Sequence, residues 1–127
     1  MWEIILSNEI QKWLDQVDDS SYEAILLKVA LLRELGPALG RPHADTIKES
    51  KHKNMKELRV QHKRHVYRLF FAFDPKRQAI VLVGGDKRGV KRFYEKLIPI
   101  ADEIFDRYLR GVLWKVLRKM GGSTLLK

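Results

Sequence analysis

The sequence predicts an α+β fold, in which two N-terminal helices and a C-terminal helical segment pack on a small, mostly antiparallel sheet. Residues 1–35 contain helically spaced apolar positions, residues 54–83 contain extended apolar segments separated by turns, and helical spacing returns after residue 90. A chain of 127 residues with 45% hydrophobic residues can bury one core. We therefore expect one domain over residues 1–109, with residues 110–127 as a basic amphipathic extension of it.

The N-terminal part of the chain predicts one strand and two helices. Residues 2–6 form a short apolar run typical of a strand, and Ser7 is suited to cap the helix that follows. Ser20 and Glu23 have the spacing of a capping box, which predicts that a second helix starts there. Gly36-Pro37 predicts its end, because glycine tolerates a left-handed C-cap and proline has no backbone N–H to donate.

Residues 54–73 predict a β-hairpin, preceded by a weaker strand signal at Thr46–Ile47. If Lys63 and Arg64 form a two-residue turn, the register of the hairpin follows directly. The predicted pairs are His62 with His65, Val60 with Tyr67, Arg59 with Arg68, and Leu58 with Leu69. Val60 and Leu58 then share one apolar face, whereas the arginine pair lies on the other.

The rest of the chain predicts one more strand and a broken helix. Residues 79–83 are apolar on both faces, which is typical of a strand inside a sheet. The glycines at 84, 85 and 89 predict unusual backbone conformations or close approach of other elements. Helical spacing then runs from residue 90, and Pro99 is expected to interrupt it and begin a second helical piece.

The charge distribution suggests a nucleic-acid partner. The net charge is +9 and the sequence pI is about 9.9, but residues 1–40 carry a net −4 while residues 41–70 and 107–127 carry +6 each. Charge concentrated in this way is typical of a nucleic-acid binder, and a basic surface that only confers solubility is the alternative. Arg59 opposite Arg68 costs up to about 1 kcal/mol unless an anion lies between them. We interpret that anion as RNA phosphate.

Other classes are disfavoured by composition. The chain has no cysteine, which excludes disulfides and thiolate metal sites, and no His–Glu spacing resembles a zinc site. The glycine-rich stretch lacks the spacing of a P-loop or a dinucleotide fingerprint, so no cofactor is expected. No apolar run approaches the roughly 20 residues that span a bilayer, and the N-terminus does not resemble a signal peptide. We expect a soluble, cytoplasmic chain without a membrane partner.

Several runs resemble the RelE/ParE superfamily and, more narrowly, the phage-derived HigB-like toxins of type II toxin–antitoxin modules. These runs are GPALGRP, HKNMKELRV, YRLFFAFDP, AIVLVGGDK and FYEKLIPIAD, together with Asp45, Ser50 and Tyr108-Leu109. The resemblance covers residues 2–109 and implies a RelE-like fold. It further implies a metal-independent endoribonuclease that cuts mRNA on the ribosome. Its partner would be a helix-turn-helix (HigA-like) antitoxin encoded beside it.

Such a nuclease uses the RNA 2′-hydroxyl as nucleophile and leaves a 2′,3′-cyclic phosphate. It needs an acceptor for the 2′ proton, cations that stabilise the phosphorane, and a donor to the leaving 5′ oxygen. Arginine suits the second task because its planar group meets phosphate bidentately. The residues and the resemblance together predict five catalytic residues: Glu57, Arg59, Arg68, Lys87 and Tyr94. We also predict five residues that bind RNA: Lys53, Lys56, Lys63, Arg64 and Arg88.

Alternatives remain for the residues and for the activity. Glu57 and Arg59 also fit a structural ion pair, Lys87 a solvated turn, and Tyr94 a core position in a helix. No residue stands out as the general base. Because the ParE branch of the same fold poisons DNA gyrase, a gyrase-directed toxin is a second hypothesis. A non-catalytic, basic nucleic-acid-binding regulator is the third.

Overall fold

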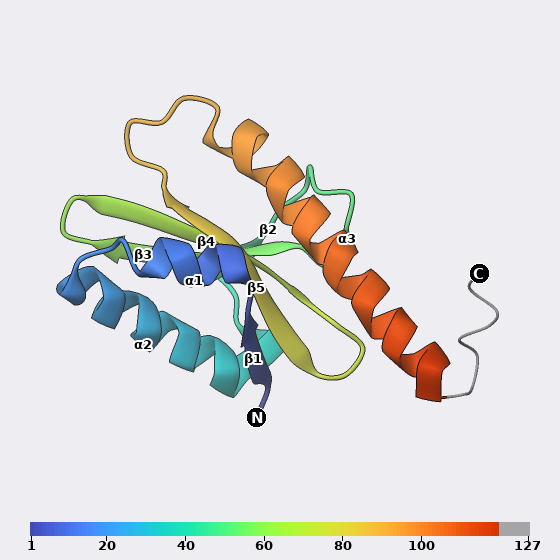
Figure 1. Cartoon of the computed structure of the whole chain (residues 1–127). Coiled ribbons are helices and arrows are strands. Elements are labelled where there is room, and N and C mark those ends of the chain that lie inside the picture. Colours follow the sequence, from blue (N-terminus) through green and yellow to red (C-terminus); the bar gives the residue numbers. More distant parts are fainter. Residues whose placement is uncertain (120–127) are drawn as a thin grey trace.

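The computed structural model describes residues 1–119, with side chains for residues 1–112. The strands are β1 (Glu3–Leu6), β2 (Ala44–Thr46), β3 (Lys56–His62), β4 (His65–Phe73) and β5 (Gln78–Asp86). The helices are α1 (Asn8–Leu14), α2 (Asp19–Leu35) and α3 (Phe93–Lys119), with a 3₁₀ turn at Gly36–Ala38. Figure 1 shows their arrangement.

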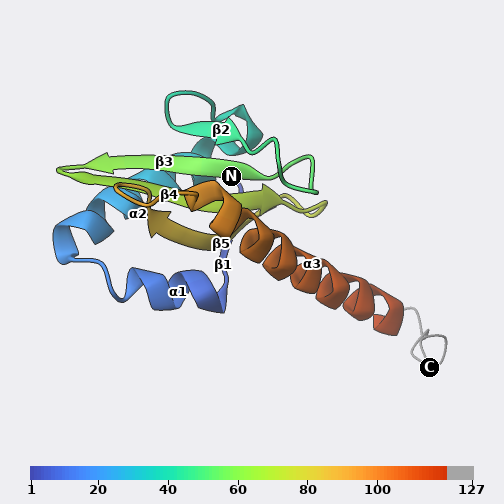
Figure 2. The ribbon, with the colours of Figure 1, turned by 90° about the horizontal axis from the view of Figure 1, so that it is seen from above.

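The strands form one five-stranded sheet in the order β1-β5-β4-β3-β2. Only the pair β1–β5 is parallel, and the other three pairs are antiparallel. Helices α1 and α2 pack on one face, and α3 crosses the other face and continues beyond it (Figures 1 and 2). The predicted α+β class is confirmed.

Each face of the sheet has its own apolar core, because side chains alternate along a strand. Leu69 and Phe71 of β4 belong to the core beneath α1 and α2. Phe70 and Ala72 belong to the core beneath α3. The strand between the cores is therefore buried on both sides, and the two helical layers contact opposite sets of its side chains.

The hairpin register is the predicted one. His62 pairs with His65, and Arg59 pairs with Arg68. Lys63, the first turn residue, has a positive φ of 53°. The predicted strand at Thr46–Ile47 is present as β2, although it ends at Thr46.

The caps of the two N-terminal helices were predicted with mixed success. Ser7 caps α1, since the N–H of Ile10 donates a 2.9 Å hydrogen bond to its hydroxyl. The capping box at Ser20 was wrong. Asp18 caps α2 by accepting a 2.8 Å hydrogen bond from the N–H of Ser21. Aspartate is as good an N-cap as serine, so the first suitable residue after the turn starts the helix.

The predicted break at Pro99 was wrong, because α3 is continuous from Phe93 to Lys119. Pro99 is exposed, and it removes only one intrahelical donor. The neighbouring residues Ile98 and Ala101 are buried against the sheet, and this packing holds the helix together. Within residues 1–119, no helix is both long and apolar enough to cross a membrane. The predicted extension at 110–127 lies partly outside the described residues.

Two adjacent glycines of β5 let a helix approach each face of the sheet. A Cβ at Gly84 would lie 2.9 Å from the ring of Trp13, which belongs to α1. A Cβ at Gly85 would lie 3.1 Å from the ring of Phe93, at the start of α3. Because any side chain would push these rings away, the predicted close approach is confirmed. The Gly85 contact is what allows the first turn of α3 to reach the arginine pair.

Candidate functional site

A carboxylate, two guanidinium groups and a phenol meet on the α3 face of the sheet. The β3–β4 register places Arg59 opposite Arg68, and Glu57 lies two residues before Arg59 on the same face. The first turn of α3 adds Tyr94, whose hydroxyl donates a 2.7 Å hydrogen bond to Oε1 of Glu57. Residues from two neighbouring strands and one helix thus share a single centre.

The anion between the two arginines is Glu57. Its side chain is only 4% exposed, and its Oε2 accepts a 3.0 Å hydrogen bond from Nε of Arg59. Nε of Arg68 lies 3.6 Å from Oε1, beyond a normal hydrogen bond. Because the chain supplies this anion itself, the facing arginines alone are not a sign of RNA phosphate, contrary to our interpretation of the sequence.

The two arginines differ in how open they are. The Arg68 side chain is 13% exposed, its Nη1 donates to the carbonyl oxygen of Tyr67, and its buried Nε has no hydrogen-bond partner. The Arg59 side chain is 32% exposed. Arg59 is therefore the more accessible cation, whereas Arg68 holds an unused donor beside Glu57.

Asp45 completes the setting of Arg59, although it was not among the predicted site residues. Asp45 lies on β2 directly opposite Glu57, and its Oδ2 is 3.2 Å from Nη2 of Arg59. Arg41 and the N–H of Thr46 also donate to this carboxylate and hold the pKa of Asp45 below its usual range. Its place opposite Glu57 follows from the β2–β3 register, which the weak strand signal did not provide.

Tyr94 is fixed on three sides. Its ring stacks on Phe70 with the centroids 5.9 Å apart, and Nζ of Lys87 lies 5.0 Å from the Tyr94 centroid. Burial, followed by the Glu57 carboxylate, raises the pKa of Tyr94. The phenol is therefore protonated at neutral pH, and the positive charge of Lys87 stands beside it. All five predicted catalytic residues are thus brought together.

The predicted RNA-binding residues divide between two ends of the sheet. Lys63 and Arg64 form the β3–β4 turn, and Lys87 follows β5 at the same end, where its N–H donates to the carbonyl oxygen of Val66. We call this end the basic rim, made of Lys63, Arg64, Lys87, Arg88, Lys91 and Arg92. Neither loop that forms the rim contains an acidic residue, although Arg92 lies 3.8 Å from the Glu95 carboxylate of α3.

Lys53 and Lys56 are not part of that end. Lys53 is exposed in the loop before β3. Lys56 alternates with Glu57 and so lies on the opposite face, where its Nζ is 6.0 Å from the ring centroid of Phe73. The structure therefore separates both lysines from the arginine pair.

The four histidines are each engaged with a partner outside the cluster. His43 contacts Lys28 and His62 contacts Ser20. His52 lies 2.7 Å from Asp106, and His65 lies 2.7 Å from Asp86. None of these contacts reaches Glu57, so the described histidines do not supply a proton acceptor to the cluster.

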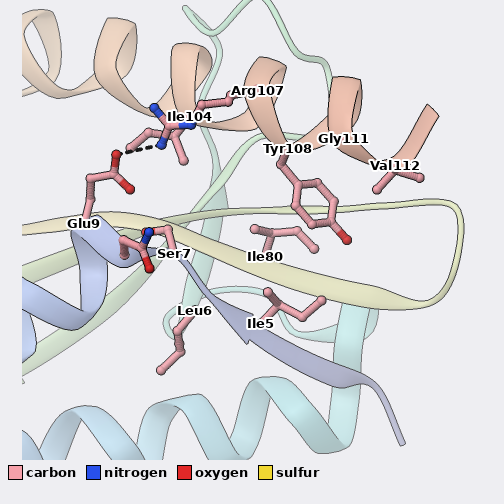
Figure 3. A pocket seen from close by; sticks show the side chains of 11 residues that line it. Ile5, Leu6, Ser7, Glu9, Ile80, Ile104, Arg107, Tyr108, Gly111 and Val112 are labelled. Carbon is pink, nitrogen blue, oxygen red and sulfur yellow. Dashed lines mark hydrogen bonds and ion pairs between the residues drawn. The ribbon is translucent and has the colours of Figure 1, made fainter. Parts of the chain in front are cut away.

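A separate hollow of about 350 Å³ lies between the β1–α1 junction and α3 (Figure 3). Arg107 and Glu9 form a 2.7 Å ion pair at its edge, and this bond lowers the pKa of Glu9. Ile5, Ile80 and Ile104 supply apolar lining. None of the predicted site residues lines it, so it does not belong to the cluster.

Comparison with known proteins gives the chain a family and a fold. Residues 12–106 match the model of a family described as "Phage derived protein Gp49-like (DUF891)". Two curated proteins of Mycobacterium tuberculosis are similar to the chain. One is named "Putative toxin HigB2" (46% identical over 102 residues, covering 79% of this chain and 51% of that protein). The other is named "Putative toxin HigB3" (41% identical over 107 residues, covering 84% of this chain and 92% of that protein). The chain thus spans about half the length of HigB2.

Two solved structures share the fold at low sequence identity. A mutant of the Escherichia coli toxin RelE in the free state superposes with a TM-score of 0.59 at 12% identity, covering 80% of this chain and 95% of that one. The archaeal RelE–RelB complex from Pyrococcus horikoshii contains a chain that superposes with a TM-score of 0.52 at 16% sequence identity. The match covers 70% of this chain and 98% of that one. The predicted RelE-like fold is confirmed.

Proposed function

Because the chain belongs to the phage-derived Gp49-like family and is homologous to HigB proteins, we propose that it is the toxin of a type II toxin–antitoxin module. We propose that it is a metal-independent endoribonuclease that cuts mRNA on the ribosome and so inhibits translation. The observation that carries this proposal is the convergence of Glu57, Arg59, Arg68 and Tyr94 on one face. The basic rim beside them provides a path for an RNA backbone.

The cluster contains groups for each step of 2′-hydroxyl attack. Glu57 is the carboxylate at its centre, and we assign it as acceptor of the 2′ proton while the O2′–P bond forms. Arg59, Arg68 and Lys87 stabilise the negative charge that develops on the phosphorane oxygens. Tyr94 is held protonated and can give its proton to the 5′ oxygen as the P–O5′ bond breaks.

RNA must enter a site whose cations are already paired with a carboxylate. Arg59 is shared between Glu57 and Asp45 and is about one-third exposed, so a phosphate oxygen can approach it from solvent. Arg68 can then turn its unpartnered Nε toward the same phosphate. On this view Glu57 and Asp45 keep the guanidinium groups in position in the free protein.

We also propose the partners that a toxin of this kind requires. A relative in fold, the archaeal RelE, is solved as a complex with RelB. We expect this chain to be neutralised by a helix-turn-helix, HigA-like antitoxin encoded beside it. Its substrate is mRNA bound to the ribosome.

Expression without antitoxin tests the proposal. The wild-type chain should arrest growth and leave cleaved mRNA with 2′,3′-cyclic phosphate ends. Arg68→Ala should relieve the arrest while circular dichroism shows an unchanged fold. The control is Lys12→Ala, which removes an exposed cation of α1 outside the predicted site residues and should stay toxic.

The outcomes separate the three functional hypotheses. Undiminished toxicity of folded Arg68→Ala would remove the assigned site. Broken DNA without cleaved mRNA would instead identify a gyrase-directed toxin. RNA binding without growth arrest and without cleavage products would identify a non-catalytic regulator.

A further inference from the structure

We propose that the exposed face of α2 is the surface on which the antitoxin docks, and that the antitoxin binds it with a basic amphipathic helix. This inference rests on the proposed function, because it locates the partner of the proposed toxin. It adds a second surface to the molecule, separate from the Glu57 cluster and the basic rim.

Exposed apolar side chains are concentrated on α2. Among the described residues, seven large hydrophobic side chains are exposed, and four of them belong to this helix. Leu27 is 75% exposed, Leu26 is 42% exposed and Tyr22 is 41% exposed. With exposed Ala30 they form the α2 strip, in which residues 22, 26 and 30 follow one another at helical spacing. Apolar side chains grouped in this way mark an interaction site.

The charge around the strip indicates the chemistry of the partner. Asp19, Glu23 and Glu34 are exposed on the same side of α2, against one exposed cation, Arg33. This acidic face belongs to a chain whose net charge is +9, so its sign is opposite to that of the whole molecule. These carboxylates make the face a poor fit for RNA phosphate and a good fit for a basic partner. A helix with apolar anchors at positions i, i+3 or i+4 and i+7, flanked by Lys and Arg, is complementary to this face.

The position of the strip predicts how the antitoxin would act. The buried side of α2 packs on the face of the sheet opposite α3, as Figure 1 shows, while the Glu57 cluster lies beneath α3. A helix on the strip would leave the cluster uncovered. Neutralisation would then come from the bulk of the antitoxin, which would keep the toxin from the ribosome.

The test replaces the most exposed residue of the strip. The probe is the helix-turn-helix protein encoded beside this chain, and calorimetry measures its affinity for purified chains that also carry Arg68→Ala. Leu27→Arg should weaken binding at least about 100-fold. In a strain expressing both proteins, with Arg68 intact, the Leu27→Arg chain should still arrest growth. Glu23→Lys should weaken binding about 10-fold and lower its salt dependence.

The matched control is Ile100→Arg. Ile100 is an exposed apolar residue on α3, at 45% against 75% for Leu27, and its variant should bind and be neutralised like the wild type. Wild-type affinity and neutralisation of Leu27→Arg would overturn the proposal. So would a change from dimer to monomer on Leu27→Arg, measured by sedimentation, because the strip would then hold a second copy. If the proposed function itself is wrong, the wild-type chain alone will not arrest growth, and the calorimetry still tests the strip.

Discussion

The hydroxyl of Tyr94 donates a 2.7 Å hydrogen bond to Oε1 of Glu57, so the first turn of α3 is tied to the start of β3. Glu57 is buried, and its other oxygen accepts from Arg59. One carboxylate therefore joins the helix to the hairpin and also orients a guanidinium group. Changes to this bond should affect stability and the proposed activity together.

Tyr94→Phe should reduce the free energy of unfolding by about 1–2 kcal/mol, because Glu57 loses a donor while the stacking on Phe70 is kept. It should also reduce toxicity, since the proton donor is lost. Urea denaturation and growth assays measure the two effects. Tyr22→Phe, at an exposed tyrosine of α2, is the control and should change neither.

Glu57→Gln should destabilise the chain more than Arg59→Gln, because removing the carboxylate leaves Arg59 opposite Arg68 without an anion between them. We expect Glu57→Gln to lower the free energy of unfolding by about 1–3 kcal/mol. Arg59→Gln should lower it by less, because the Arg59 side chain is partly exposed. The double variant should be less destabilised than the sum of the single variants. Strictly additive unfolding free energies would contradict the pairing.

Asp86 should make stability depend on pH in the acid range. Burial by itself raises the pKa of Asp86, but hydrogen bonds from His65 and from the N–H groups of Val66 and Arg88 outweigh it and lower the pKa. The stabilisation is complete above the unfolded pKa of about 3.9 and is lost as pH falls through the lower folded value. Asp86→Asn should make stability depend less on pH in this range, as measured by the urea midpoints of unfolding from pH 6 to pH 2. An equally steep acid decline in Asp86→Asn would contradict the assignment.

The basic rim should dominate the salt dependence of RNA binding. Arg64→Ala and Arg88→Ala should each reduce the slope of log K against log salt concentration by about 0.7, the value for one lost contact with a single strand. Fluorescence anisotropy with a short labelled RNA measures this slope. Lys12→Ala removes an exposed cation of α1 and should leave the slope unchanged.

Gly36→Ala should destabilise the chain by about 1–3 kcal/mol. The residue has a φ of +53°, and a Cβ there would lie 2.3 Å from the indole of Trp2. Gly40→Ala is the matched control in the same loop, because nothing lies within 4 Å of its Cβ position, and it should change stability by less than about 0.5 kcal/mol. Thermal or urea denaturation of the pair measures the difference, and equal stabilities would show that the ring moves aside freely.

Much of the fold was predictable from local pattern. The register of the β3–β4 hairpin follows from a two-residue turn, since a tight turn leaves little choice in which residues face each other. The cap at Ser7 and the stop at Gly36 follow from backbone groups that neighbouring residues must satisfy. The break at Pro99 failed for a related reason: the pattern shows the lost donor but not the packing of Ile98 and Ala101 that compensates for it.

Alternation along two strands was sufficient to place Glu57, Arg59 and Arg68 on one face. The catalytic roles of these residues, and those of Lys87 and Tyr94, stay predictions. The sequence did not reveal that Glu57 is the anion between the arginines, nor that Asp45 of β2 holds Arg59 from the other side. These relationships depend on distances across strands and on the path of α3 over Gly85, which residue spacing does not specify. Local chemistry thus determines which residues share a face, and long-range packing determines which of them meet.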